Sequence, residues 1–136
     1  MLTFQVYTAQ RVEYVGGSFF GNETGSPTRT LLSFLVSSLG GSYEDMICFI
    51  PTVTLNWSSL LKHFSTVLSS LHSIGFNVVL VLLDGHKTNI KFFLELGNGH
   101  KEICIQHPFN TSSKLFLMFD PVHIFKNFYH NFERKR

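Results

Sequence analysis

Two uninterrupted apolar runs, each followed by an aspartate, constrain the fold of this chain more than any other feature. Residues 77–83 read NVVLVLL and lead into Asp84, and residues 114–119 read KLFLMF and lead into Asp120. Short apolar runs rich in branched and aromatic residues are typical of strands covered on both faces of a sheet. Open α/β folds place their sites at the carboxyl edge of such a sheet. We therefore expect an α/β domain, in which these aspartates either serve a site or only end their strands.

The size and composition predict one globular domain over residues 1–136. The chain is 44% hydrophobic and 15% charged, so it can bury one continuous core and does not have the composition of a disordered polypeptide. Its net charge of +2 does not by itself predict nucleic-acid binding, and the excess lies mostly in Arg134, Lys135 and Arg136. This basic end predicts at most a weak contact with DNA.

The cysteines, histidines and N-terminal residues indicate no metal motif and no membrane partner. Cys48 and Cys104 lie far apart in apolar, strand-like runs, which favours buried, reduced thiols. The seven histidines show no ligand spacing. The sequence contains no run of about 18 apolar residues, so it predicts no membrane span. The N-terminal residues lack the charged region and apolar run of a signal peptide, so we expect an intracellular protein.

Periodicity and turn residues predict the strands and loops. Strands are expected at residues 2–7, 46–53, 77–83 and 114–119, with a hairpin or bulged strand at 11–21, a turn at 22–27, a short extended piece at 101–106 and a loop at 107–113. Residues 30–39 fit a helix or a strand about equally well. The glycine-rich break at 40–42 favours a hairpin between this segment and 46–53.

Three helices are expected where apolar residues recur at three- and four-residue steps. They span residues 56–74, closed by Gly75, residues 88–96, closed by Gly97, and a last segment opened by Asp120 and Pro121. An aspartate before a proline is a helix-start signal, because the carboxylate caps the first turn and proline suits the first helical position. The apolar face of the last helix consists of Val122, Phe125, Phe128 and Phe132.

The order of these elements predicts the fold class. Antiparallel strands followed by alternating helices and strands indicate a mixed β-sheet flanked by helices. An RNase H-like fold has this order, and ferredoxin-like and partial Rossmann sheets stay open on pattern alone. No glycine-rich phosphate loop supports the Rossmann alternative.

The turn after the first apolar run carries the first candidate site residue. Asp84 stands in the sequence DGHKTN, where Gly85 permits a sharp turn and leaves the carboxylate accessible. Asp84 either caps this turn or binds Mg²⁺, although phosphodiester chemistry on paired Mg²⁺ needs carboxylates from several strands. Asn89 is either an exposed polar residue of the next helix or a residue that orients Asp84.

The second apolar run leads to a further group of polar residues. The N-cap role before Pro121 accounts for Asp120 without any catalysis. His123, Lys126 and Asn127 follow at helical steps of three and four, which bring them together on neighbouring turns. For His123 the ordinary expectation is a buried histidine that is hydrogen-bonded to the backbone.

Segments along nearly the whole chain carry a family resemblance. They are residues 7–17 (YTAQRVEYVGG), 30–34 (TLLSF), 50–51 (IP), 75–79 (GFNVV), 84–89 (DGHKTN), 92–93 (FF), 107–109 (HPF) and 119–127 (FDPVHIFKN). In this order and spacing they resemble the catalytic domain of P-element-type transposases, a family that includes THAP-domain transposase relatives. The DGxxxN turn together with DPxHxxKN is the most specific part of the resemblance.

The resemblance implies an RNase H-like fold, with residues 30–39 as a strand. Members of the family cut and rejoin DNA with two aspartates and one glutamate around Mg²⁺. Asp84 matches the second of these aspartates and would be a metal ligand. Asp120, His123, Lys126 and Asn127 match a recurrent family segment, and we treat them as site-supporting residues without a catalytic role. The resemblance also implies a nuclear protein.

This sequence departs from the family at the first catalytic position. Phe4 and Gln5 stand where the family has an Asp-Glu pair. The family's catalytic glutamate, its GTP-binding insertion and its N-terminal zinc-coordinating domain have no counterpart in these 136 residues. Of three metal carboxylates, only Asp84 is matched.

We therefore expect an incomplete, transposase-like domain that does not cleave or join DNA by itself. It would act through weak DNA contact, or through contact with a protein partner or a second copy of itself. The alternative is a Mg²⁺-dependent transposase or nuclease fragment that receives the missing carboxylates from other segments or a partner chain. The sequence identifies no small-molecule substrate.

Overall fold

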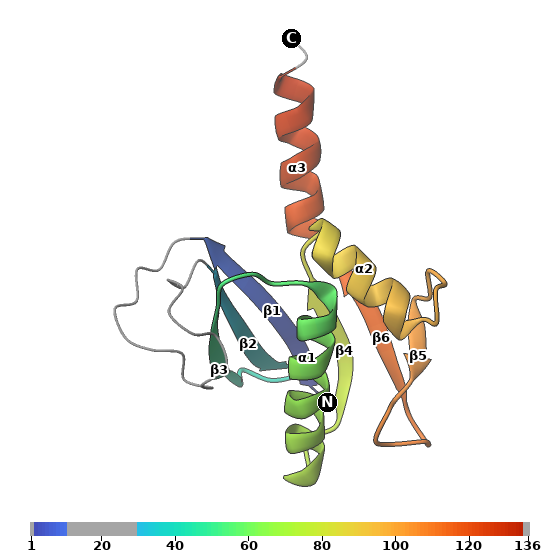
Figure 1. Cartoon of the computed structure of the whole chain (residues 1–136). Coiled ribbons are helices and arrows are strands. Elements are labelled where there is room, and N and C mark those ends of the chain that lie inside the picture. Colours follow the sequence, from blue (N-terminus) through green and yellow to red (C-terminus); the bar gives the residue numbers. More distant parts are fainter. Residues whose placement is uncertain (1, 11–29, 135–136) are drawn as a thin grey trace.

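The computed structural model describes residues 2–10 and 30–134, and Figure 1 shows how their elements are arranged. The elements are β1 (Leu2–Gln10), β2 (Thr30–Ser38), β3 (Glu44–Thr52), α1 (Trp57–Ser73), β4 (Val78–Leu83), α2 (Lys87–Leu96), β5 (Cys104–Gln106), β6 (Lys114–Phe119) and α3 (Pro121–Glu133). The hairpin expected at residues 11–21 and the turn expected at 22–27 lie outside the described residues.

All six described strands form one mixed sheet in the order β3-β2-β1-β4-β6-β5. β1, β2 and β3 pair antiparallel, β5 pairs antiparallel with β6, and β4 runs parallel to both of its neighbours, β1 and β6. Among the described strands, the two parallel pairs that β4 makes with β1 and β6 do not fit the antiparallel sheet of a ferredoxin-like fold. The antiparallel first half likewise excludes a doubly wound parallel sheet.

Residues 30–39, whose pattern fitted a helix or a strand, form strand β2 in the interior of the sheet. β2 lies between β1 and β3 and pairs with each of them. Leu32, Phe34 and Val36 are fully buried in the main core, while Ser33 and Leu35, which alternate with them, are buried as well. A segment buried on both faces has no polar side that would show a strand period of two, which explains why its pattern was ambiguous.

Helices α1 and α2 cover one face of the sheet and build the core there (Figure 1). Leu60, Phe64, Leu68 and Leu71 of α1 are buried, and Phe64 meets Phe92 of α2 edge-on with ring centroids 5.2 Å apart. Such an aromatic pair adds about 0.5–1.5 kcal/mol beyond the area that it buries. This packing holds α2 against β4 and thereby positions the turn between them.

The opposite face of the sheet is covered by none of the described helices. In β6, Leu115 and Leu117 are buried, whereas Phe116 and Met118 are 47% and 43% exposed. The expectation that residues 114–119 form a strand buried on both faces is therefore wrong. An uninterrupted apolar run does not by itself show that the described helices cover the strand on one side only.

The predicted helix ends are confirmed with one change of detail. The side chain of Asn56 caps α1 by accepting a hydrogen bond from the Ser59 amide at 2.8 Å, and Gly75 takes the left-handed conformation after the helix, with φ of 91°. After α2 it is Asn98, with φ of 53°, that is left-handed. Gly97 is needed for another reason, because a Cβ there would collide with the His100 carbonyl oxygen.

The last helix, α3, extends away from the body of the domain (Figure 1). None of its described residues is buried. The predicted apolar face is present, but it is exposed to solvent.

The two cysteines are free and half-buried, and burial raises the pKa of the Cys48 thiol. Full burial, as the apolar runs suggested, is not reached. Among the described residues no helix is long and apolar enough to cross a membrane.

Candidate functional site

The turn between β4 and α2 holds Asp84 in a defined orientation. The Asp84 Oδ1 atom accepts hydrogen bonds from the His86 backbone amide at 2.9 Å and from the Asn89 Nδ2 atom at 2.8 Å. The first bond closes an Asx-turn, which aspartate favours because its short side chain reaches the amide two residues on. Both bonds use Oδ1, so Oδ2 is left for solvent or another group.

Asn89 orients Asp84 and is not an exposed surface residue. Its side chain is only 2% exposed, and its amide reaches back from the first turn of α2 to the carboxylate. A buried amide needs a partner, and the carboxylate supplies one. Of the two roles considered for Asn89, the structure therefore supports the second.

His86, which sequence reasoning did not single out, is the N-cap of α2. Its Nδ1 atom accepts from the Thr88 amide at 3.3 Å. Asp84 thus caps the turn before the helix, whereas the helix itself is capped by His86. The sequence signal was weak, because histidine is not among the preferred N-cap residues.

Asp84 and Asp120 lie side by side at the carboxyl edge of the sheet. β4 and β6 are adjacent and parallel, with Leu83 paired to Phe119, and the Asp120 amide donates to the Leu83 carbonyl oxygen at 2.7 Å. Neighbouring strands are about 4.8 Å apart. Each aspartate directly follows one residue of this pair, so the two residues occupy equivalent positions. Their distance in sequence had given no sign of this.

Asp120 is the N-cap of α3, as expected. Its Oδ1 atom accepts from the Val122 amide at 2.9 Å, and its Oδ2 atom lies 3.6 Å from the His123 Nδ1 atom. The expectation that His123 is buried and bonded to the backbone is wrong, because its side chain is 49% exposed. When His123 is protonated, a pair that is this accessible contributes at most about 1 kcal/mol.

Lys126 and Asn127 lie further along α3, and both are exposed. In the described part of the chain neither makes a hydrogen bond or an ion pair with Asp84 or Asp120. The helical steps do place them on turns next to His123, but α3 leads them away from the sheet (Figure 1). The structure therefore brings together Asp84, Asn89, Asp120 and His123 and leaves these two outside.

Strand β1 lies beside β4 on the side opposite β6 and places two uncharged residues, Phe4 and Gln5, next to it. Phe4 pairs with Val81 and Gln5 with Leu82, so this part of β1 runs beside the last residues of β4 toward the same edge. Neither residue offers a carboxylate. Within residues 2–10 and 30–134 no three His, Cys, Asp or Glu side chains are grouped so that they could hold a metal ion. The donor set of this edge does not fit a two-metal centre, which needs several converging carboxylates.

A second polar feature, missed by spacing arguments, lies beside the last turn of α1, where the rings of His72 and His107 are 5.9 Å apart. His107 is only 1% exposed, and its Nδ1 atom accepts from the Phe109 amide at 3.2 Å. Nδ1 is therefore unprotonated, and Nε2, which carries the proton, has no partner among the described residues. Burial, and secondly the nearby His72, lower the pKa of His107. This geometry describes a neutral histidine that holds the HPF loop in place.

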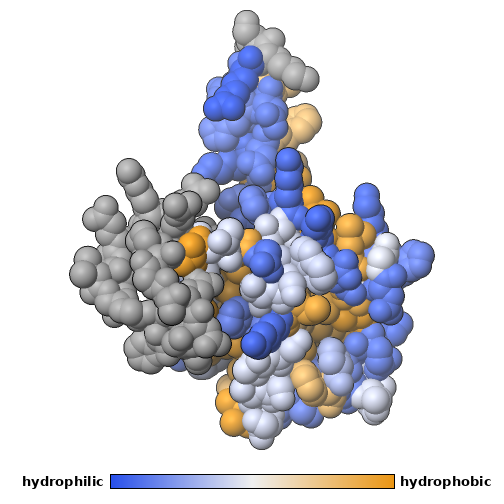
Figure 2. Space-filling model, in the orientation of Figure 1, coloured by the Kyte–Doolittle hydropathy of each residue, from blue (hydrophilic) through white to orange (hydrophobic). Residues whose placement is uncertain are grey.

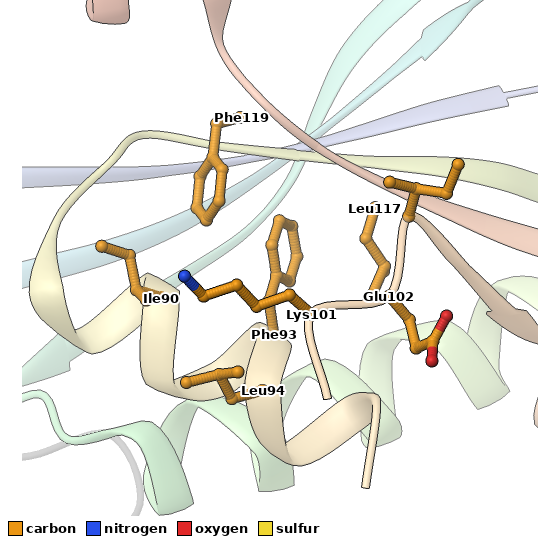
Figure 3. A pocket seen from close by; sticks show the side chains of 8 residues that line it. Ile90, Phe93, Leu94, Lys101, Glu102, Leu117 and Phe119 are labelled. Carbon is orange, nitrogen blue, oxygen red and sulfur yellow. The ribbon is translucent and has the colours of Figure 1, made fainter. Parts of the chain in front are cut away.

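A cavity of about 300 Å³ lies between α2, residues 101–103 and β6 (Figure 3). Its walls include the rings of Phe93 and Phe119, the Lys101 side chain runs across it, and the Glu102 carboxylate points away. None of the predicted site residues lines this cavity. It is mainly apolar and separate from the aspartate edge.

Comparison with known proteins agrees with this arrangement. Residues 4–97 match the family described as "TNP-like, RNase H N-terminal domain". A solved structure, the Drosophila P element transposase strand transfer complex, contains a similar chain with a TM-score of 0.72 and 20% sequence identity. The similarity covers 92% of this chain and 27% of that chain, so this sequence spans about a quarter of the length of the transposase. Among curated proteins, no relative matches. The predicted RNase H-like α/β fold is confirmed.

Proposed function

Because this chain belongs to the family of TNP-like RNase H N-terminal domains, we propose that it is a transposase-like module whose sheet edge does not cleave or join DNA by itself. The observation that carries this proposal is the register of β1 beside β4, which puts Phe4 and Gln5 next to the end of the strand that carries Asp84. Phenylalanine cannot bind a metal ion, and a neutral glutamine is a poor substitute for a carboxylate.

The engagement of the two aspartates supports the same proposal. Oδ1 of Asp84 already accepts two hydrogen bonds, and Oδ1 of Asp120 accepts one from the Val122 amide of its own helix. Mg²⁺ loses its hydration water reluctantly and binds weakly where few carboxylate oxygens are offered. The edge thus holds Asp84 in place without the further ligands that would make it a catalytic centre.

The module would then act by binding, in the nucleus, where transposase-like proteins meet their DNA. Lys126, His130 and Arg134 project from the exposed helix α3, and Lys135 and Arg136 follow in sequence. A basic cluster of this size supports a weak contact with the phosphate backbone that weakens as the salt concentration rises.

A second candidate function rests on the adjacency of Asp84 and Asp120. Two carboxyl-bearing residues at equivalent positions of parallel strands supply part of the carboxylate set that a metal-dependent nuclease needs. A further carboxylate from a partner chain, or from another segment, would turn the edge into a Mg²⁺-dependent site for strand cleavage or transfer.

The test is an assay of purified protein on labelled DNA with Mg²⁺ or Mn²⁺, together with a calorimetric titration of Mg²⁺. We compare the wild type with Asp84→Asn, and with Asp45→Asn as a matched control on the exposed part of β3. We expect no metal-dependent cleavage and no Mg²⁺ binding heat in any of the three. Cleavage that disappears in Asp84→Asn and persists in Asp45→Asn would overturn the proposal in favour of the second candidate.

A further inference from the structure

The face of the sheet opposite α1 and α2 carries an apolar surface. Phe116 and Met118 of β6 are exposed there, and their register partners in β4, Leu80 and Leu82, are half-buried beside them. We call these four residues the open sheet face: Leu80, Leu82, Phe116 and Met118.

Helix α3 carries a second apolar surface without a partner among the described residues. Five large side chains, each at least 60% exposed, lie along one side of the helix, each of them three or four residues from another of the set. We call them the α3 stripe: Val122, Phe125, Phe128, Tyr129 and Phe132. In Figure 2 the surface of α3 that is turned to the viewer is mostly hydrophilic, with apolar atoms along its edge. Four aromatic rings in water are an unusual exposure for a folded chain.

The junction between β6 and α3 leads the helix away from its own sheet (Figure 1). Only Asp120 separates Phe119, the last residue of β6, from Pro121, the first residue of α3. By contrast, residues 84–86 separate β4 from α2, and that turn reverses the chain. Asp120 is also held by two hydrogen bonds. Its backbone amide donates to the Leu83 carbonyl oxygen, and its Oδ1 atom accepts from the Val122 amide. The helix therefore continues away from the body (Figure 1).

The two surfaces match in length and in chemistry. The 13 residues of α3 span about 20 Å at 1.5 Å per residue, and the 6 residues of β4 or β6 span about 20 Å at 3.3 Å per residue. Both surfaces consist of apolar side chains, and the polar residues of α3 lie on its other side.

From this match we propose that two copies of the chain pair by exchanging α3, so that the α3 stripe of each copy covers the open sheet face of the other. Such a contact is isologous and closes after two copies, as most homodimer contacts do. If each stripe residue buries on the order of 100 Å² and meets a smaller area of the half-buried sheet residues, two exchanged helices bury roughly 1,500 Å². Stable dimers bury about 1,200–2,000 Å² or more. The exchange does not depend on the proposed lack of DNA cleavage.

The experiment measures the mass of the full chain by light scattering after gel filtration, over a range of concentrations. The stripe variant combines Phe125→Asp with Phe128→Asp. Its matched control, Asn127→Asp with His130→Asp, adds the same two carboxylates on the polar side of α3. The sheet variant combines Phe116→Thr with Met118→Lys, because threonine keeps a high strand propensity. Circular dichroism and thermal unfolding confirm that each variant is folded.

We expect the wild type and the matched control to be dimers, and the stripe and sheet variants to dissociate at least about tenfold more readily, as interface hot spots do. Mixing the two variants should restore dimers. In the mixed pair the intact α3 of the sheet variant meets the intact sheet of the stripe variant, and the second contact places Asp side chains opposite a lysine.

Three results would overturn the exchange. A wild-type protein that stays monomeric at all concentrations would exclude the exchange of α3, and this result does not depend on the folding of any variant. A sheet variant that dimerises as well as the wild type indicates pairing of α3 with α3. Mixed variants that stay monomeric show that the helix and the sheet are not partners across the dimer.

Discussion

The two strand ends at the carboxyl edge began as the same sequence pattern and became different structures. At the end of β4, the chain turns through residues 84–86, α2 packs back onto the sheet, and Asn89 is buried against Asp84. At the end of β6, Asp120 alone leads into α3, and none of the residues of that helix is buried. The comparison teaches that an aspartate after an apolar strand marks an edge, whereas the length of the following turn decides whether a packed site forms there.

The largest expected difference between the two ends is in the packing of their helices. Phe92 in α2 is fully buried, and Phe128 in α3 is 70% exposed. We expect Phe92→Ala to lower the free energy of unfolding by about 3–5 kcal/mol because it leaves a cavity. Phe128→Ala should change it by less than about 0.5 kcal/mol. Urea unfolding of dilute protein measures both, and equal losses would show that α3 packs on its own domain.

The buried amide at the β4 end gives the next largest effect. Asn89→Ala removes the hydrogen bond to Asp84 Oδ1 inside the turn and should cost about 1–3 kcal/mol. The exposed Asn127→Ala on α3 is the matched control and should be nearly neutral. Chemical unfolding followed by fluorescence measures the two losses. If Asn89→Ala leaves the free energy of unfolding unchanged, Asn89 does not orient Asp84.

The cap at the β6 end gives a smaller effect. Asp120→Ala removes the side-chain acceptor for the Val122 amide and should cost about 1 kcal/mol of helix stability, whereas Asp120→Asn keeps an acceptor and should cost less. Circular dichroism at 222 nm is the measurement for this cap, because the loss should appear as fraying of α3. If both variants lose the same helicity, the charge of Asp120 matters and its capping bond does not.

The smallest expected effect is a pH dependence from the loop before β6. Burial and His72 lower the pKa of His107 in the folded chain, below the value of about 6.5 in the unfolded chain. The unfolded state then binds more protons as the pH falls through 6.5, so the free energy of unfolding decreases toward acid pH. Protonation of Nδ1 would also break the bond from the Phe109 amide.

Unfolding curves at several pH values between about 7.5 and 5.5 measure this slope. His107→Gln should make it shallower, with a residual slope from His63, whose pKa is lowered by burial and by Lys62. A slope that is unchanged in His107→Gln would show that His107 does not contribute.

Local patterns were sufficient for most of the elements and for part of the candidate site. The apolar steps in α1, the aspartate before Pro121 and the runs ahead of Asp84 and Asp120 each depend on neighbours within a few residues, so the sequence reveals them. The DGHKTN turn indicated both the access of Asp84 and a role for Asn89, because helical spacing puts that amide near the turn. The resemblance to the transposase family was carried by such local segments as well.

What could not be predicted depends on contacts between distant residues. The adjacency of Asp84 and Asp120 follows from the pairing of β4 with β6, and the placement of Phe4 and Gln5 beside that edge follows from the pairing of β1 with β4. The exposure of His123 and the burial of His107 depend on which elements pack against them. No spacing along the chain encodes these contacts, because they join segments far apart in sequence.

By itself the sequence determined where most of the strands and helices lie and which aspartates end strands, since short-range periodicity records these, and the family resemblance implied that Phe4 stands in place of the first family carboxylate. Only the tertiary structure decided that Asp84 is held by a buried Asn89 while Asp120 opens an exposed helix. The physical reason is that burial is a property of the assembled sheet. The same apolar pattern is covered where a turn returns the chain and is left open where it does not.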